Sequence, residues 1–165
     1  MIPDLFWIPG PWPGRLAIAG RPRGGDWLGD EARGLRRAGV DLVVSLLERD
    51  EAAQLGLADE ARVAEASGLG FLSFPIPDRG IPVSAPAAAS LVATLAGSLE
   101  AGKNVAVHCR QSVGRSGLVA AAVLASSGFD PETAIAMVSA ARGEPVPETG
   151  KQHAWILQLQ ARVTP

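Results

Sequence analysis

Short apolar runs alternate along this chain with longer segments of helical pattern. The runs rich in Val, Leu, Ile and Phe predict strands at residues 16–19, 41–47, 71–76 and 104–108. Helix-start residues, glycine stops and alanine-rich stretches predict helices at residues 26–37, 51–66, 84–100, 114–127, 131–141 and 149–162. The second of these helices is expected to break at Gly56, and Asp26 is expected to cap the first.

Strands that alternate with helices are typical of an α/β fold. We therefore expect a single domain over residues 1–165, with a mostly parallel central sheet flanked by helices on both faces. Residues 1–14 are rich in Pro, Gly and Trp, and predict an extended segment packed on that domain. Sites in such sheets lie beyond the carboxyl ends of the strands.

Composition narrows the classes of function. Apolar residues make up 47% of the 165 positions, too many for a disordered chain, and the net charge of −2 provides no general basic field for nucleic acid. One cysteine excludes an internal disulfide and suits a reducing compartment. The sequence has no signal-peptide pattern, membrane-spanning segment or cluster of metal ligands. We expect a cytoplasmic monomer that binds neither nucleic acid nor membrane and needs no cofactor or metal.

That cysteine lies in the most informative segment, residues 107–117, which read Val-His-Cys-Arg-Gln-Ser-Val-Gly-Arg-Ser-Gly. A predicted strand ends at Cys109, and a predicted helix begins at Gly114. Successive backbone N–H groups in such a loop form an anion nest, and the helix N-terminus adds further donors. These features also stabilise a thiolate. We call residues 109–115 the cysteine loop.

The side chains of this segment suit a phosphate. Arg115 presents a planar fork of donors that can hold two phosphate oxygens, and Ser116 can donate its hydroxyl to a departing thiolate. The backbone that would cradle the phosphate belongs to Arg110, Gln111, Ser112, Val113 and Gly114. The simplest alternative is a buried cysteine that closes a core strand, but it leaves the two neighbouring arginines unexplained.

Three separate segments resemble a known family. The first is His-Cys-x5-Arg-Ser at residues 108–116. The second is Pro-Ile-Pro-Asp-Arg-Gly-Ile-Pro at residues 75–82, which we call the acid loop. The third is made of residues 130–135, 142–143 and 148–152. Together they identify the chain as similar to the cysteine-dependent protein tyrosine phosphatase superfamily. The resemblance is to the small dual-specificity type, and within it mostly to the cyclin-dependent kinase-associated phosphatase branch.

The resemblance implies a role for several residues. Cys109 would be the nucleophile, Arg115 the phosphate ligand, Asp78 the general acid, and Ser116 the donor to the leaving thiolate. Protonating the leaving oxygen makes expulsion of an alcohol or phenol from phosphorus easier. Alternatively, Asp78 caps a local turn.

For Arg79 and Gln152 two interpretations are open, and His108 is expected to have a supporting role. Arg79 would bind either substrate phosphate or a surface carboxylate. Gln152 resembles a glutamine that positions water in some branches, or is a solvated polar residue of a helix. His108 cannot easily reach the Cys109 thiol, because adjacent strand residues point to opposite faces. The family implies that this histidine is buried, hydrogen-bonded and supports the loop.

The function predicted is hydrolysis of a phosphomonoester through a cysteinyl-phosphate, on a phosphoprotein or a small phosphate ester. A rhodanese-like sulfurtransferase is one alternative, although its loop usually lacks the distal arginine. A non-catalytic phosphoprotein-binding module is another, although it would need neither thiolate nor acid. Phosphotyrosine, phosphoserine or phosphothreonine and phosphoinositides all remain open, and Arg110 as the one extra cation in the loop disfavours a polyanionic lipid.

Overall fold

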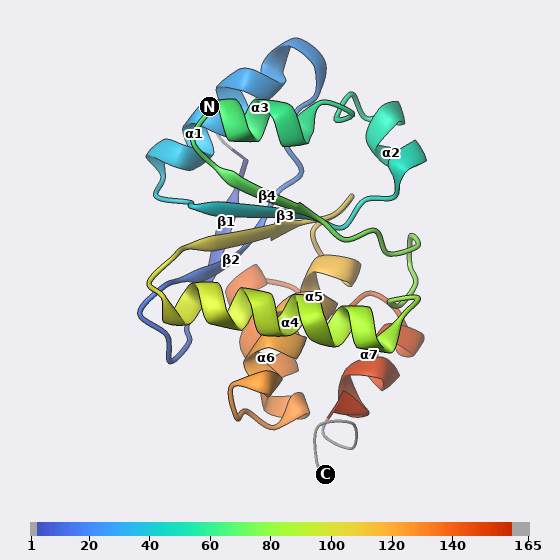
Figure 1. Ribbon diagram of the computed structural model, residues 1–165. Coiled ribbons are helices and arrows are strands. Elements are labelled where there is room, and N and C mark those ends of the chain that lie inside the picture. Colours follow the sequence, from blue (N-terminus) through green and yellow to red (C-terminus); the bar gives the residue numbers. More distant parts are fainter. Residues whose placement is uncertain (1–2, 160–165) are drawn as a thin grey trace.

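The computed structural model describes residues 3–159, which form an α/β fold around one five-stranded sheet (Figure 1). The strand order is β1-β2-β5-β3-β4, and only β1 runs antiparallel to its neighbour. The strands are β1 (Leu5–Ile8), β2 (Leu16–Ala19), β3 (Leu42–Ser45), β4 (Gly70–Ser73) and β5 (Val105–His108). The carboxyl ends of the four parallel strands therefore lie along one edge, with β5 in the centre.

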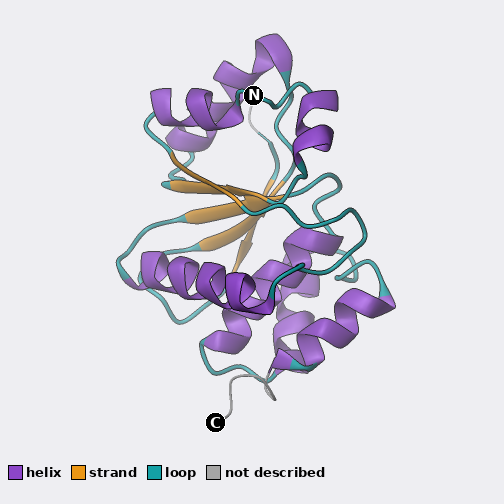
Figure 2. Cartoon of the chain, turned by 45° about the vertical axis from the view of Figure 1, so that its right-hand side comes forward, coloured by secondary structure: helices purple, strands orange, loops and turns teal. Residues whose placement is uncertain are grey.

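Helices cover both faces of the sheet (Figures 1 and 2). One face carries a short 3-10 turn (Gly25–Trp27), α1 (Leu28–Arg37), α2 (Arg49–Gln54) and α3 (Glu60–Ala66). The opposite face carries α4 (Ala85–Glu100), α5 (Gly114–Ser126), α6 (Pro131–Arg142) and α7 (Gly150–Leu157). The predicted fold class, a mostly parallel sheet between two helical layers, is confirmed.

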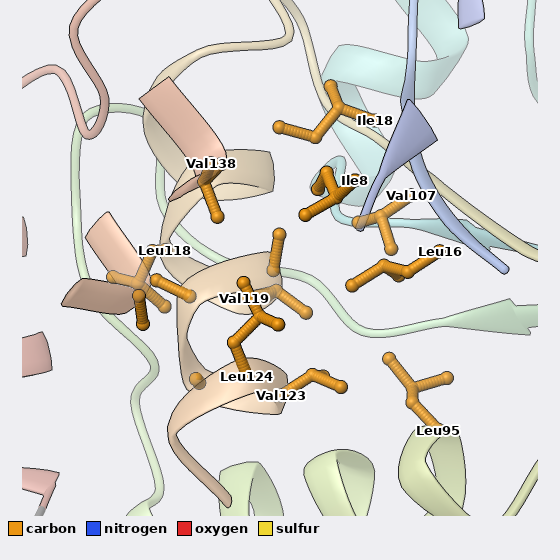
Figure 3. Packing of buried hydrophobic residues seen from close by; sticks show 14 of the residues in the cluster. Ile8, Leu16, Ile18, Leu95, Val107, Leu118, Val119, Val123, Leu124 and Val138 are labelled. Carbon is orange, nitrogen blue, oxygen red and sulfur yellow. The ribbon is translucent and has the colours of Figure 1, made fainter. Parts of the chain in front are cut away.

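The larger core lies between the sheet and the second helical layer. Every residue from Gly114 to Leu124 of α5 is buried, which explains why this helix is apolar on all sides. Figure 3 shows Val119 and Val123 of α5 facing Leu16 of β2, with Leu95 of α4 beside them. A smaller core between the sheet and α1 and α3 includes Leu35, Val40 and Val43. Burial on both faces fixes β5 and α5, and with them the loop that joins the two elements.

At the level of single elements, the structure bears out one detailed expectation and differs from two others. The break expected at Gly56 is confirmed: α2 and α3 are separate helices, because Gly56 adopts a left-handed φ of 72° that ends the first. Asp26 lies inside the 3-10 turn and is not the cap of α1. Residues 5–8 of the segment predicted to be extended pair with β2 as a strand. The predicted helical residues 160–162 lie outside the described residues. No helix within residues 3–159 is long and apolar enough to cross a membrane.

Candidate active site

The cysteine loop begins where the central strand β5 ends. β2 and β3 flank β5 in parallel, so this loop lies in the middle of the carboxyl edge of the sheet. Cys109 is 2% exposed, and α5 begins at Gly114 directly after the loop. The strand, loop and helix predicted around the single cysteine are all present.

Contacts from outside hold the backbone of the cysteine loop. The Ser112 hydroxyl donates to the Ala19 carbonyl at 2.7 Å, and Arg142 Nε donates to the Ser112 carbonyl at 2.8 Å. Arg21 donates to the Arg110 carbonyl at 3.3 Å. Ser112 has a left-handed φ of 61°, a conformation that curls the chain at this point. Two carbonyls of the loop are thus bound by arginines from outside it, an arrangement that suits a loop whose amides form an anion nest.

Arg115 is the most heavily bonded side chain of the site. Its guanidinium is 2% exposed and forms a two-pronged ion pair with Glu51, at 2.6 Å and 3.0 Å. It also donates to the Ile76 carbonyl at 2.9 Å and to Asp78 Oδ1 at 3.1 Å. The donors in these bonds are Nη1 and Nη2, and the bonds fix the plane of the guanidinium group beside Cys109.

The Arg115–Glu51 pair shifts the pKa of both partners toward their charged forms. Burial lowers the pKa of Arg115, but the bond to Glu51 and the charges of Cys109 and Glu51 outweigh burial and raise that pKa. Burial raises the pKa of Glu51, but the bonds from Arg115 and from the Glu48 amide outweigh burial and lower it. Both side chains therefore stay ionised through the neutral range.

The acid loop carries Asp78 to the mouth of the site. Its backbone follows β4, with the Ile76 amide donating to the Leu46 carbonyl at 3.1 Å. The Asp78 side chain is 53% exposed, so that it meets solvent on one side and Arg115 on the other. Asp78 thus stands beside the predicted phosphate ligand, open to a leaving group that enters from solvent.

The acid loop is tied to the start of α7. Arg79 has a left-handed φ of 59° and pairs with Glu148 at 2.7 Å. Of the two partners expected for Arg79, the structure thus contains the surface carboxylate. Gln152 is fully buried and its Nε2 donates to the Gly80 carbonyl at 3.0 Å. Its Oε1 accepts from the Glu148 and Thr149 amides, both at 3.1 Å, so Gln152 is not the solvated helix residue considered as an alternative.

Ser116 and His108 lie on either side of the nucleophile in sequence. The Ser116 hydroxyl is buried and has no hydrogen-bond partner among residues 3–159. A buried hydroxyl without a partner is costly, which suggests a partner supplied during function. His108 is fully buried, and its Nε2 lies 2.6 Å from Glu60 Oε2.

Sequence reasoning missed two acidic residues of the site, Glu51 and Glu60. Glu51 belongs to the first turn of α2, just after β3, and reaches Arg115 across 64 positions of sequence. Its place beyond the carboxyl end of a predicted strand was the one usable signal. Glu60 reaches His108 across 48 positions, and nothing in the local pattern distinguishes it from other helix-start acids.

Glu51→Ala is expected to lower the free energy of unfolding by about 3–5 kcal/mol, because it leaves the buried Arg115 charge with too few partners. Denaturant unfolding at pH 7 measures this loss, with the exposed Glu65→Ala as the matched control. The pKa of Glu51 is lowered in the folded state, so its contribution is present above the ordinary value of 4.5 and fades as pH falls below it. The gap between wild type and Glu51→Ala should therefore narrow in acid; a gap that widens there would contradict this account.

Comparison with known proteins agrees with the site. A family model described as "Polymorphic toxin system, DSP-PTPase phosphatase" matches residues 17–129, and the chain belongs to this family. It is therefore a cysteine-dependent phosphatase of the dual-specificity type. Among curated proteins, none matches the chain in sequence.

Solved structures of similar shape include three phosphatases. Kinase associated phosphatase, solved with its catalytic-site cysteine replaced by serine, superposes with a TM-score of 0.88 at 19% identity, covering 99% of this chain and 97% of the other. Tk-PTP in its active form gives 0.81 at 29% identity, covering 98% and 99%. PTPMT1 in complex with PI(5)P gives 0.73 at 19% identity, covering 90% and 94%. The predicted membership of the superfamily is confirmed.

Proposed function

We propose that this phosphatase hydrolyses phosphomonoesters on proteins through a cysteinyl-phosphate on Cys109. The observation that supports it most is the convergence of three groups: a buried thiol at the start of the cysteine loop, Arg115 fixed beside it, and Asp78 within 3.1 Å of Arg115. This arrangement speaks against both alternatives. A module that only binds phosphoproteins would need neither a nucleophile nor an acid, and a sulfurtransferase would not need Asp78 as an acid.

In the first step, the Cys109 thiolate attacks phosphorus while Arg115 and the loop amides hold the equatorial oxygens. The P–O bond to the leaving group breaks as the S–P bond forms, and charge on the equatorial oxygens is stabilised by donors already in place. Asp78 gives its proton to the leaving oxygen. Substrate phosphate competes with Asp78 for Arg115, and this competition frees the carboxyl group for its role as acid.

In the second step, water attacks the cysteinyl-phosphate. Asp78, now a carboxylate, takes the proton from this water, and inorganic phosphate leaves as the S–P bond breaks. The unpartnered Ser116 hydroxyl donates to the sulfur as it regains its charge. Gln152, whose amide already bonds the acid loop, holds that loop over the site during this step.

The charged side chains around the mouth of the site favour a phosphoprotein substrate over a polyphosphorylated lipid. Arg79 pairs with Glu148 at 2.7 Å, and Arg110 lies 3.9 Å from Glu51, so each of these rim cations already faces a carboxylate. Little free positive charge is then left for further phosphates on a headgroup. We also infer a monomer that acts in the cytoplasm, in keeping with its one unpaired cysteine.

A panel of phosphotyrosine, phosphoserine and phosphothreonine peptides, assayed beside phosphoinositides, tests the substrate. We expect the highest kcat/KM on a phosphopeptide. Equal or greater kcat/KM on a phosphoinositide would overturn the protein assignment, and activity on thiosulfate alone would overturn the reaction class.

Asp78→Asn is expected to lower turnover on the order of 10²–10⁴-fold for esters with poor leaving groups, because the amide cannot donate the required proton. The defect should shrink for an activated aryl phosphate whose leaving group departs without a proton. The rates of wild type and variant are compared across a series of leaving groups of graded basicity. A defect of the same size for every leaving group would show that Asp78 only shapes the acid loop.

A further inference from the structure

One arginine at the mouth of the site has no place in the mechanism above. Arg21 follows β2, and its Nη1 donates to the carbonyl of Arg110, the residue after the nucleophile, at 3.3 Å. The Arg21 side chain is exposed and has no carboxylate partner within residues 3–159. A guanidinium group carries five N–H donors, so Arg21 can bind the cysteine loop and an anionic ligand at the same time.

The backbone fixes Arg21 beside the cysteine loop. β2 and β5 pair in parallel, with Ile18 opposite Val107. The same register, continued for three residues beyond this pair, brings Arg21 beside Arg110. Pro22 follows, and a residue that precedes proline is restricted to extended conformations. Arg21 therefore has a defined position one peptide unit from the nucleophile.

The other arginines around the mouth of the site mostly face carboxylates. Arg49, the first residue of α2, has no ion pair among residues 3–159, but Glu48 and Asp50 flank it in sequence. None of the hydrogen bonds in the described part of the chain joins Arg49 to the cysteine loop. The paired arginines are Arg115 with Glu51 and Asp78, Arg110 with Glu51, Arg79 with Glu148, Arg142 with Glu144, and Arg23 with Glu31.

The carboxylates that bind Arg115 lie on one side of the cysteine loop. In the strand order β1-β2-β5-β3-β4, this loop follows the middle strand. Glu51 lies beyond β3 and Asp78 beyond β4, whereas Arg21 lies beyond β2 on the other side. A substrate whose phosphate occupies the cysteine loop thus meets carboxylates on one side and an unpaired cation on the other. Negative charge on the substrate is attracted only to the side of β2.

We propose that Arg21 is a specificity-determining residue that binds an acidic side chain of the protein substrate, close to the phosphorylated residue. This inference rests on the proposed function, in which the substrate is a phosphoprotein. The planar guanidinium group matches the two oxygens of a carboxylate. One cation suits one carboxylate, whereas a polyphosphorylated headgroup would bring several further charges to the same place.

Three phosphopeptides that share the phosphorylated residue test this assignment. One has uncharged flanks, one has aspartates on the N-terminal side, and one has aspartates on the C-terminal side. The readout is the ratio of kcat/KM on an acidic peptide to kcat/KM on the uncharged peptide. For the wild-type protein we expect a ratio of about 5 with one of the two acidic peptides, the upper range for an exposed ion pair. Added salt should lower that ratio, because exposed charges are screened.

Three variants assign the preference to Arg21. Arg21→Gln should bring the ratio to about one, whereas Arg21→Lys keeps the charge and should keep part of the preference. Arg37→Gln is the matched control, because Arg37 is an exposed arginine without an ion pair in the described chain. It ends α1 just before β3 begins, at the opposite edge of the sheet, and its loss should leave the ratio unchanged. A general loss of activity cancels, because the ratio is taken within each variant.

A wild-type ratio near one with both acidic peptides would overturn the proposal, and so would an undiminished ratio in Arg21→Gln. Equal gains with both acidic peptides, or a ratio lowered as much by Arg37→Gln, would show an effect of net charge alone and would also overturn it. Failure of the proposed function is distinct from these results, because wild-type protein would then hydrolyse none of the three phosphopeptides.

Discussion

Replacing Cys109 with serine is expected to reduce turnover on the order of 10⁵-fold or more, the scale seen when a covalent nucleophile is removed. A serine hydroxyl is far less acidic than a thiol, and the imidazole next to it in sequence, His108, is engaged with Glu60.

Phosphate binding should survive in the Cys109→Ser variant. Arg142 and Arg21 bind carbonyls of the loop, and the Ser112 hydroxyl binds the Ala19 carbonyl of β2. None of these bonds depends on the sulfur, so the anion nest keeps its shape. Steady-state rates and titration with a phosphopeptide are measured on the same preparation. Substantial turnover by the serine variant would exclude the cysteinyl-phosphate, and loss of binding together with activity would point to a collapsed loop.

Arg115→Lys is expected to be nearly as damaging as Arg115→Ala, with kcat/KM lowered on the order of 10³-fold or more, as for other arginines that stabilise a phosphoryl-transfer transition state. Lysine keeps the charge but loses the planar fork. In this site the guanidinium group must donate to both Glu51 carboxylate oxygens and also donate to the substrate phosphate. The single ammonium group of lysine cannot make both sets of hydrogen bonds.

The control for this prediction is Arg62→Lys, which changes an exposed arginine of α3 that pairs with Asp59 and should leave kcat/KM unchanged. Denaturant unfolding of Arg115→Lys separates lost catalysis from lost stability. Near-normal turnover by Arg115→Lys would show that positive charge alone is what the reaction needs at this position.

The cysteine loop could be predicted from sequence because its parts are contiguous. A strand, a nest of backbone amides and a helix start follow one another between Val105 and Ser116, and local chemistry alone specifies what they can bind. Asp78 is more distant but lies in a loop whose Pro and Gly residues mark it. The apolar runs that predicted β2, β3 and β5 are buried, which is why they stood out from their surroundings.

What the sequence did not reveal depends on tertiary contacts. Glu51 and Glu60 look like ordinary helix-start acids, and only the packing of α2 and α3 beside β3 and β5 brings them to Arg115 and His108. The strand β1 was missed for a similar reason. Its four residues are apolar, but the prolines and glycine on either side of them resemble an extended tail, and pairing with β2 is what makes them a strand.

Trapping the covalent intermediate tests the central claim most directly. Enzyme mixed with excess phosphopeptide and quenched in acid within the first turnovers is digested, and the peptide containing Cys109 is examined by mass spectrometry. This account predicts one phosphoryl group on Cys109, with more of it in Asp78→Asn when an activated aryl phosphate is used, because the base for hydrolysis is then missing. Rapid turnover with no phosphoryl group on Cys109, or with the group on another residue, would contradict it.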